Sequence, residues 1–264
     1  MPTDTKIYDG FRVSSIATPR EQFVTCVLEE NLTDIAARNT QRFDFMPVLD
    51  HKESLVGVVE LSHYFDKPAP AESVSNHFVR LAENHLIGAN AGILDYILEA
   101  DRRRFCFVVS QTSVIGLVCL SDLQELSVRA TLFSVVTNLE LSMQNTIRRA
   151  FAEPDKWQAL LHPNRRANIE KHLEEARKGD GAVDPLLYTQ FCDKRDILLE
   201  SILKHHSERD RASVILRTVE KLRNALAHAN EYAETSAKAA AVCQTVRDLL
   251  SMKELIDSFG KEEA

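Results

Sequence analysis

The sequence is poor in glycine and proline, with eight of each among 264 residues. Collagen-like chains and low-complexity linkers are much richer in these residues, and disordered chains have fewer apolar ones. Apolar residues make up 44% of this chain and charged residues 27%, which predicts a soluble globular protein. At roughly 150 residues per domain, the length favours two domains.

The sequence also lacks a long hydrophobic run. Its longest uncharged stretch, which includes Cys106 to Ser121, contains four consecutive polar residues and is too short to span a bilayer. Met1-Pro2-Thr3-Asp4 begins the chain without a basic region and an apolar core behind it, so we expect no signal peptide. These absences predict a cytoplasmic protein without a membrane partner.

Motifs for metals and for covalent catalysis are missing as well. The five cysteines have an odd count and no Cys-x-x-Cys spacing, which predicts free, buried thiols in a reducing compartment rather than a disulfide framework or a zinc site. There is no glycine-rich phosphate loop, nucleophile elbow or His-Glu-x-x-His. We therefore expect no required cofactor and no metal.

Positive charge is scarce in the first half of the chain. Residues 1–125 carry 11 Lys and Arg against 18 Asp and Glu, whereas residues 126–264 carry 21 against 21, and the sum gives the net charge of −7. Non-specific binding to nucleic acid depends on a net basic surface. The charge therefore excludes a broad basic surface for nucleic acid, but not a small local phosphate site.

An internal repeat is present in the first half. Phe45–Asp50 and Leu55–Val59 form a strand, turn and strand pattern that returns at Phe105–Ser110 and Val114–Val118. The first strands are 60 residues apart and the second strands 59, so the copies differ by one turn residue. Apolar residues at helical spacing precede each hairpin, and short helices are expected at 61–65 and 122–128. The predicted unit is β-α-β-β-α, twice, with copies at about 10–66 and 72–128.

The repeat resembles the tandem cystathionine-β-synthase (CBS) pair, a regulatory module that often binds adenine nucleotides between its copies. Met46–Asp50, Leu55–Val59 and Gly116–Leu123 carry the resemblance. It implies an α+β domain over residues 1–125 and AMP, ADP or ATP as a regulatory ligand.

The resemblance implies one nucleotide site at most. Family members that bind nucleotides end the second strand with Ser/Thr-x-x-Asp, whose carboxylate binds the ribose hydroxyls. The second copy keeps Ser121 and Asp122 but has Cys119 at the hydroxyl position, while the first copy has Glu60 and His63 at the matching places. Asp122 fits equally well as a helix N-cap.

Arg102-Arg103-Arg104 is a second feature of the first half. Guanidinium groups suit phosphate oxygens, but such a triplet is also typical of a solvated turn before a buried strand.

From about Leu126 the strand pattern stops and helical periodicity takes over. Helices are expected at about 126–152, 164–178, 186–205, 208–230 and 236–258, which predicts an all-α bundle of about five helices over residues 126–264. In the fourth helix, Ile215, Val219, Leu222 and Leu226 form the predicted core face, opposite Arg217, Lys221, Asn224 and His228.

The helical half resembles the HEPN group, helical domains named for higher eukaryotes and prokaryotes that include metal-independent ribonucleases. The resemblance rests on Arg223-Asn224 with His228, and on Asn138–Leu141 with Ile147-Arg148. It implies catalytic roles for Arg223, Asn224, His228 and Glu140 in RNA cleavage by the 2′-hydroxyl. Histidine titrates near neutral pH, so His228 is the candidate acid or base, and Arg223 would stabilise the charged phosphate.

Arg223 and His228 are about 140° apart on an ideal helix, so one straight helix does not point both at one phosphate. A helix distortion or a second subunit would be needed, and both resemblances imply a homodimer. Two alternatives remain open. The helical half is a non-catalytic scaffold that only dimerises or docks a partner, or the CBS-like pair is purely structural and binds no ligand.

Overall fold

The computed structural model describes residues 11–179, 181, 183–228 and 230–259. They form two compact units. The first contains the residues up to Thr131 together with Ala233–Cys243, and the second contains Leu132–Tyr232 and the residues from Gln244 onward. The division falls within two helices, α3 (Leu126–Ala150) and α8 (Ser236–Ser258), so each of them contributes residues to both units. The first ten residues of the expected first domain lie outside the described residues.

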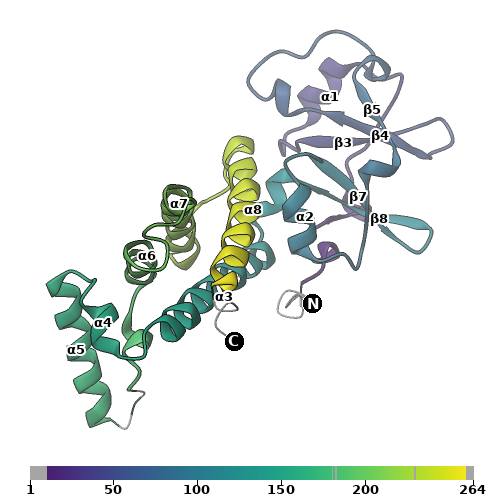
Figure 1. Cartoon of the computed structure of the whole chain (residues 1–264). Coiled ribbons are helices and arrows are strands. Elements are labelled where there is room, and N and C mark those ends of the chain that lie inside the picture. The colour runs from purple at the N-terminus through teal and green to yellow at the C-terminus, as the bar shows by residue number, and fades with distance from the viewer. Residues whose placement is uncertain (1–10, 180, 182, 229, 260–264) are drawn as a thin grey trace. The chain divides into compact units, whose positions relative to one another are not determined.

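The first unit contains two four-stranded sheets (Figure 1), with strand orders β2-β3-β4-β5 and β1-β8-β7-β6. In each sheet a short strand pairs in parallel with the first strand of a hairpin. The other edge of each sheet comes from the segment that leads into the opposite copy. In the first sheet this edge is β5, which pairs with β4, and in the second sheet it is β1, which pairs with β8. The strands are β1 (Thr18–Pro19), β2 (Cys26–Val27), β3 (Phe45–Leu49), β4 (Leu55–Glu60), β5 (Phe78–Arg80), β6 (Leu86–Gly88), β7 (Phe105–Ser110) and β8 (Ser113–Cys119).

The predicted repeat is confirmed in its first four elements. Helix α1 (Leu32–Arg38) lies between β2 and β3, and α2 (Ile93–Glu99) lies between β6 and β7. The fifth element is a correction, because the expected short helices are the 3-10 turns η4 (Ser62–Tyr64) and η7 (Leu120–Gln124). A 3-10 turn closes with fewer residues than an α-helix, which suits the short segments after β4 and β8.

The two copies share an apolar core. Phe45 of the first copy and Phe105 of the second occupy matching positions, and their ring centroids are 5.2 Å apart. Val58, Phe107 and Leu117 are buried in the same cluster. Because this cluster draws residues from both hairpins, each hairpin buries this face against the other, whereas Leu32, Ile35 and Met46 belong to a separate core within the first copy.

The second unit is mostly helical, as the sequence predicts. Besides parts of α3 and α8, it contains α4 (Pro154–Gln158), α5 (Pro163–Lys178), α6 (Phe191–Glu200) and α7 (Arg209–Ala227). The expected helix at 186–205 is shorter, because the 3-10 turn η8 (Pro185–Tyr188) precedes α6 and the helix ends at Glu200. Helix α4 was not expected; Pro154 occupies its first turn, where the missing N–H of proline costs nothing.

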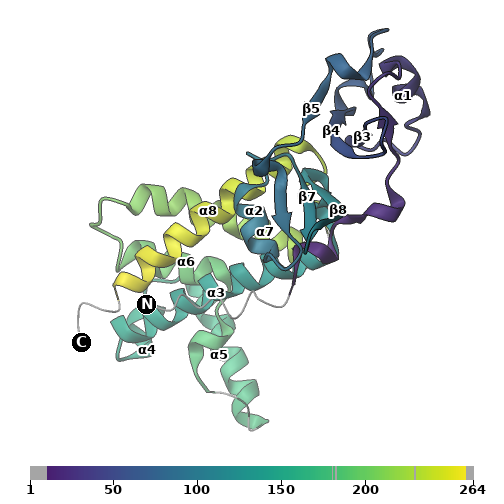
Figure 2. The same ribbon diagram turned by 90° about the vertical axis from the view of Figure 1, so that its right-hand side faces the viewer.

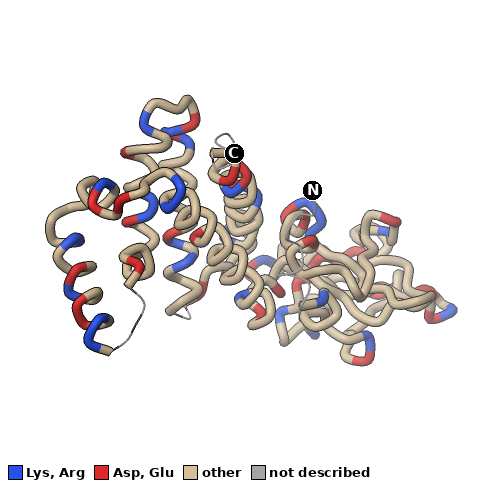
Figure 3. Tube along the Cα trace, turned by 60° about the horizontal axis from the view of Figure 1, so that its bottom comes forward, with Lys and Arg blue, Asp and Glu red and all other residues tan. Residues whose placement is uncertain are grey.

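The helices of the second unit bury apolar stripes at helical spacing. Ile215, Val219, Leu222 and Leu226 of α7 are buried, which confirms the predicted core face. Figures 1 and 2 show α3 and α8 side by side, and Thr146 Oγ1 of α3 donates to the Ile256 carbonyl of α8 at 3.3 Å. Both signs of charge occur along these helices (Figure 3). Among the described residues, no helix is long and apolar enough to cross a membrane.

Candidate functional site

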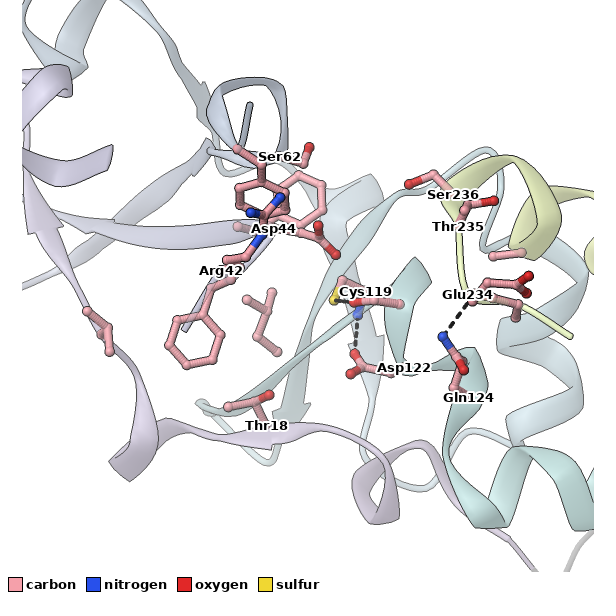
Figure 4. A pocket seen from close by; sticks show the side chains of 18 of the residues that line it. Thr18, Arg42, Asp44, Ser62, Cys119, Asp122, Gln124, Glu234, Thr235 and Ser236 are labelled. Atoms are coloured by element: carbon pink, nitrogen blue, oxygen red, sulfur yellow. Dashed lines mark hydrogen bonds between the residues drawn. The ribbon is translucent and has the colours of Figure 1, made fainter. Parts of the chain in front are cut away.

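The first unit contains a pocket of about 570 Å³ (Figure 4), within the range of roughly 300–1,000 Å³ that is common for small-molecule sites. Its lining comes from five segments: residues 18–24, the start of β3 with the residues before it, the turn after β4, the end of β8 with η7, and the start of α8 with the residues before it. Apolar side chains form part of the wall, among them Phe23, Val24, Phe45 and Leu117. Asp122, Ser121 and Cys119, the three residues that the sequence predicts for nucleotide binding, all line this pocket.

Figure 4 shows Asp122 below Cys119, to which a hydrogen bond joins it. The strand β8 ends at Cys119, whose backbone N–H donates to Asp122 Oδ2 at 2.6 Å. Cys119 is therefore the N-cap of η7, and Asp122 closes the first turn from within it. A carboxylate offers about four acceptor positions, so this bond leaves Asp122 able to accept from a ligand.

Burial raises the pKa of Asp122 to about 6, and the Cys119 backbone N–H limits the rise. Asp44 and Glu125 raise the pKa further, because a second negative charge nearby disfavours ionisation. Burial also raises the pKa of the Cys119 thiol, which therefore stays protonated at neutral pH and lies 3.0 Å from Ser121 Oγ. The pocket thus contains a carboxyl group that gains its charge near neutral pH.

Asp44 and Arg42 come from the first copy and line the same pocket. The Arg42 guanidinium lies over the Phe65 ring, 4.6 Å from its centroid, and pairs with Asp66 at 3.3 Å. Within the described part of the chain, neither Asp44 nor Asp122 forms an ion pair with a basic side chain. Carboxylates from the two copies therefore line one cavity without a cation of their own.

The start of α8 supplies a wall of the pocket that sequence reasoning missed. Gln124 Nε2 of η7 donates to the Ala233 carbonyl at 3.2 Å, which holds this segment beside η7. Thr235 Oγ1 accepts the Lys238 N–H at 3.2 Å, and the Glu234 carboxylate forms an ion pair with Lys238. Glu234, Thr235 and Ser236 line the pocket. The sequence allows Thr235 to be recognised as a helix N-cap, but the residues around it do not indicate which cavity the start of the helix lines.

The matching positions of the first copy are arranged differently. Glu60 corresponds to Cys119, and it pairs with Arg104 at 2.6 Å and accepts the Ser62 hydroxyl at 2.8 Å. His63 corresponds to Asp122, and its Nε2 lies 3.5 Å from the Glu60 carboxylate. The correspondence also holds in the backbone, because Leu61 N–H donates to the Asp44 carbonyl and Leu120 N–H to the Arg104 carbonyl. An ion pair therefore occupies the polar positions that form the pocket in the other copy.

The three arginines before β7 have protein partners. Arg102 pairs with Glu99 at 3.2 Å, Arg103 donates to the Leu86 carbonyl at 2.6 Å, and Arg104 pairs with Glu60. These contacts favour the structural interpretation of the triplet, since each guanidinium already donates to an acceptor within the first unit.

The residues that the HEPN resemblance singles out lie in the second unit. Arg223 and Asn224 are near the end of α7, where Arg223 Nη1 donates to Asn224 Oδ1 at 3.3 Å. His228 is the C-cap of the helix, its side chain is exposed, and its N–H donates to the Asn224 carbonyl. The helix therefore brings these three residues to one end, with Asn224 and His228 on the exposed side.

Glu140 has a different environment. Its carboxylate accepts from Lys194 Nζ at 2.9 Å, and the same ammonium donates to the Thr189 carbonyl at 2.9 Å. Lys194 is only 3% exposed, and removing one partner of a buried ion pair is strongly destabilising. Within the described residues, no hydrogen bond or ion pair joins Glu140 to Arg223 or His228. The contact gives Glu140 a structural role between α3 and α6.

The described residues contain no group of three or more histidine, cysteine or acidic side chains that is arranged to hold a metal ion. All five cysteines are free thiols; Cys26, Cys106 and Cys243 are buried as expected, whereas Cys119 and Cys192 are half-buried.

No protein-family model and no curated protein matches the chain. Among solved structures, the CBS domain of a bacterial CNNM/CorC family Mg²⁺ transporter in complex with ATP is 23% identical, with a TM-score of 0.38, and the match covers 46% of this chain and 89% of that one. CBSX2 in complex with AMP is 20% identical, with a TM-score of 0.35 and coverage of 47% and 97%. The CBS domains of a transcriptional regulator from Streptococcus pneumoniae are 21% identical, with a TM-score of 0.35 and coverage of 44% and 99%.

Proposed function

We propose that the protein is a nucleotide-responsive regulator in which a CBS-type pair binds an adenine nucleotide and controls the helical half. The observation that carries the proposal is the place of Asp122, at the end of β8 and inside a pocket of about 570 Å³ with an apolar wall. A carboxylate accepts from two neighbouring ribose hydroxyls at once, and an aromatic and aliphatic wall suits a base. Ser121 and Cys119 complete the proposed ribose end of the site.

The route from the pocket to the helical half runs along α8. Its first residues, beginning at Ser236, line the pocket, whereas Val246, Leu249, Met252 and Ile256 are buried apolar residues of the second unit. A ligand that contacts the start of α8 changes the forces on a helix whose later turns belong to the other unit's core. Regulation by this route requires that α8 have two arrangements and that the ligand bind them with different affinity.

Hydrogen exchange tests the proposal on the full chain. With AMP as the probe, we expect slower amide exchange in residues 233–243 and a change in exchange along residues 244–258, while α5 remains unchanged as an internal control. Exchange that changes only in the sheets would leave nucleotide binding in place and contradict the route through α8. The absence of any change at millimolar AMP would contradict the binding itself.

A second candidate function concerns the end of α7. The exposed Asn224 and His228, with Arg223 bonded to Asn224, favour a metal-independent endoribonuclease formed by two copies of the chain. We expect structured RNA to be cleaved in the presence of EDTA, and cleavage to be lost in both Arg223→Ala and His228→Ala. Arg211→Ala is the matched control, because it removes an exposed charge from the first turn of the same helix, away from these residues.

The scaffold alternative predicts a different outcome of the same experiment. If the helical half only dimerises or docks a partner, the two alanine variants change association in sedimentation analysis, and no RNA is cleaved by the parent protein. The homodimer that both proposals use is tested by the same sedimentation measurement.

A further inference from the structure

The charges around the pocket narrow the class of ligand that it accepts. Four charged side chains line it: Arg42, Asp44, Asp122 and Glu234. Two of them are paired, Arg42 with Asp66 and Glu234 with Lys238. Asp44 and Asp122 remain as carboxylates that, in the described part of the chain, have no basic partner. The lining therefore carries an excess of negative charge at neutral pH.

The two unpaired carboxylates come from different copies. Asp44 belongs to the segment that enters β3, and Asp122 to the turn after β8. Burial is the main cause of the raised pKa of Asp122 and of the Cys119 thiol, and the charge of Asp44 makes a smaller contribution in the same direction. The charge of Asp44 also weakens the binding of an anion, because a fixed carboxylate repels a phosphate as it repels a second carboxylate.

Only a small amount of positive charge is available against a phosphate. Arg42 is the one lysine or arginine among the lining residues, and its guanidinium is shared with Asp66. The N-terminus of α8 adds a partial positive charge, which Glu234 beside it offsets. One guanidinium and one helix end suit a single phosphate, whereas a triphosphate brings several negative charges to two unpaired carboxylates.

We infer that the pocket selects an adenine nucleoside or nucleoside monophosphate and rejects polyphosphates, with Asp44 as the residue that sets this preference. The inference rests on the proposed nucleotide binding and specifies its ligand. Asp122 binds the ribose in every case, so it contributes equally to adenosine and to ATP. Asp44 is assigned no hydrogen bond to the ligand that would offset its negative charge, so its effect on the phosphate chain is repulsion.

Titration calorimetry of the full chain with adenosine, AMP, ADP and ATP, each with and without Mg²⁺, tests this inference. We expect adenosine and AMP to bind at least tenfold more tightly than ATP without Mg²⁺, and this difference to shrink with Mg²⁺, because the ion neutralises part of the charge of ATP. Asp44→Asn is expected to reduce the ratio of the AMP and ATP affinities at least threefold, because ATP binds more tightly to this variant. The affinity for adenosine should change little. Glu83→Gln is the matched control, since it removes one exposed carboxylate of the same unit outside the pocket.

The outcomes separate the two proposals. ATP that binds as tightly as AMP without Mg²⁺ overturns the selectivity, and so does an unchanged ratio of the two affinities in Asp44→Asn. Both outcomes leave nucleotide binding intact. The absence of heat with all four ligands overturns the proposed function and the selectivity together.

Discussion

The two copies of the repeat have the same strands and different polar ends. In the second copy, Asp122 and the Cys119 backbone are hydrogen-bonded and line a pocket, whereas in the first copy Glu60 pairs with Arg104 and lies 3.5 Å from His63. The matching residues differ in charge, because Asp44 stands where the other copy has Arg104. The two copies therefore share their hairpins, while the polar residues at three matching positions differ in charge and in the contacts they make.

The largest effect is expected at Asp122. Asp122→Ala should weaken AMP binding at least about 100-fold, because two hydrogen bonds to a charged acceptor contribute roughly 1.5 kcal/mol each at the lower end of the usual range. His63→Ala, at the matching position of the first copy, should leave affinity within about twofold. Calorimetry measures both, and thermal unfolding of Asp122→Ala shows whether the lost bond to Cys119 affects the fold. Equal losses in the two variants would contradict the distinction between the copies.

The second comparison is between the two glycines of the hairpins. A Cβ on Gly57 would overlap the carbonyl oxygen of Val79 in the neighbouring strand, whereas a Cβ on Gly116 would meet the Thr18 carbonyl oxygen at 2.9 Å. Gly57→Ala should lower the free energy of unfolding by about 2–3 kcal/mol, and Gly116→Ala by about 1 kcal/mol. Urea unfolding checks the order, and a larger effect at Gly116 would show that the short strand β1 is the more rigid edge.

The pH dependence of adenosine binding distinguishes the second copy from the first. The pKa of Asp122 is raised to about 6 from its usual 3.8, so the carboxylate is mostly protonated at pH 5 and mostly ionised at pH 7. Adenosine donates its ribose hydroxyls to the ionised form, and its affinity should therefore rise about tenfold between these pH values. Adenosine is the right probe because it has no phosphate that titrates. An equal rise in Asp122→Asn would assign the pH dependence to another group.

The same shift affects stability with the opposite sign. A carboxyl group whose pKa is raised on folding is easier to bury when protonated, so its contribution to stability falls as pH rises from 3.8 towards about 6. Asp122→Asn should remove that part of the pH dependence and be more stable than the parent above pH 6. Denaturant unfolding at pH 4 and pH 7 measures this difference, provided that no ligand is present.

The smallest effect is expected at the first copy's ion pair. The Arg104 side chain is 41% exposed and that of Glu60 17%, and a partly exposed pair contributes roughly 0–1 kcal/mol. Arg104→Ala should lower the free energy of unfolding by about 1 kcal/mol at most and leave AMP binding unchanged. A loss of AMP binding in this variant would place a second ligand at the first copy.

Local pattern was sufficient for much of the fold. The hairpins and the five longest helices are predictable from alternation and helical periodicity, because a strand or helix that buries one face repeats apolar residues along its own length. The extents of η4, η7 and α6 were harder to predict, since the choice between a 3-10 turn and an α-helix depends on how the next segment of the chain packs.

The candidate site was only partly predictable. Asp122, Ser121 and Cys119 could be located from the end of a repeated strand. The contribution of α8 could not, because Gln124 and Ala233 are separated by 109 positions and their hydrogen bond is invisible to any local pattern. Glu60 was recognisable as a departure from the other copy, but its pairing with Arg104 depends on how the two hairpins meet.

The number of ligands bound per chain tests the central claim most directly. A calorimetric titration of the full protein with AMP at pH 7 measures it without any substitution. The different polar ends of the two copies predict one AMP per chain. Two AMP molecules per chain would contradict the assignment of binding to the second copy alone, and none would contradict the assignment of the pocket to an adenine nucleotide.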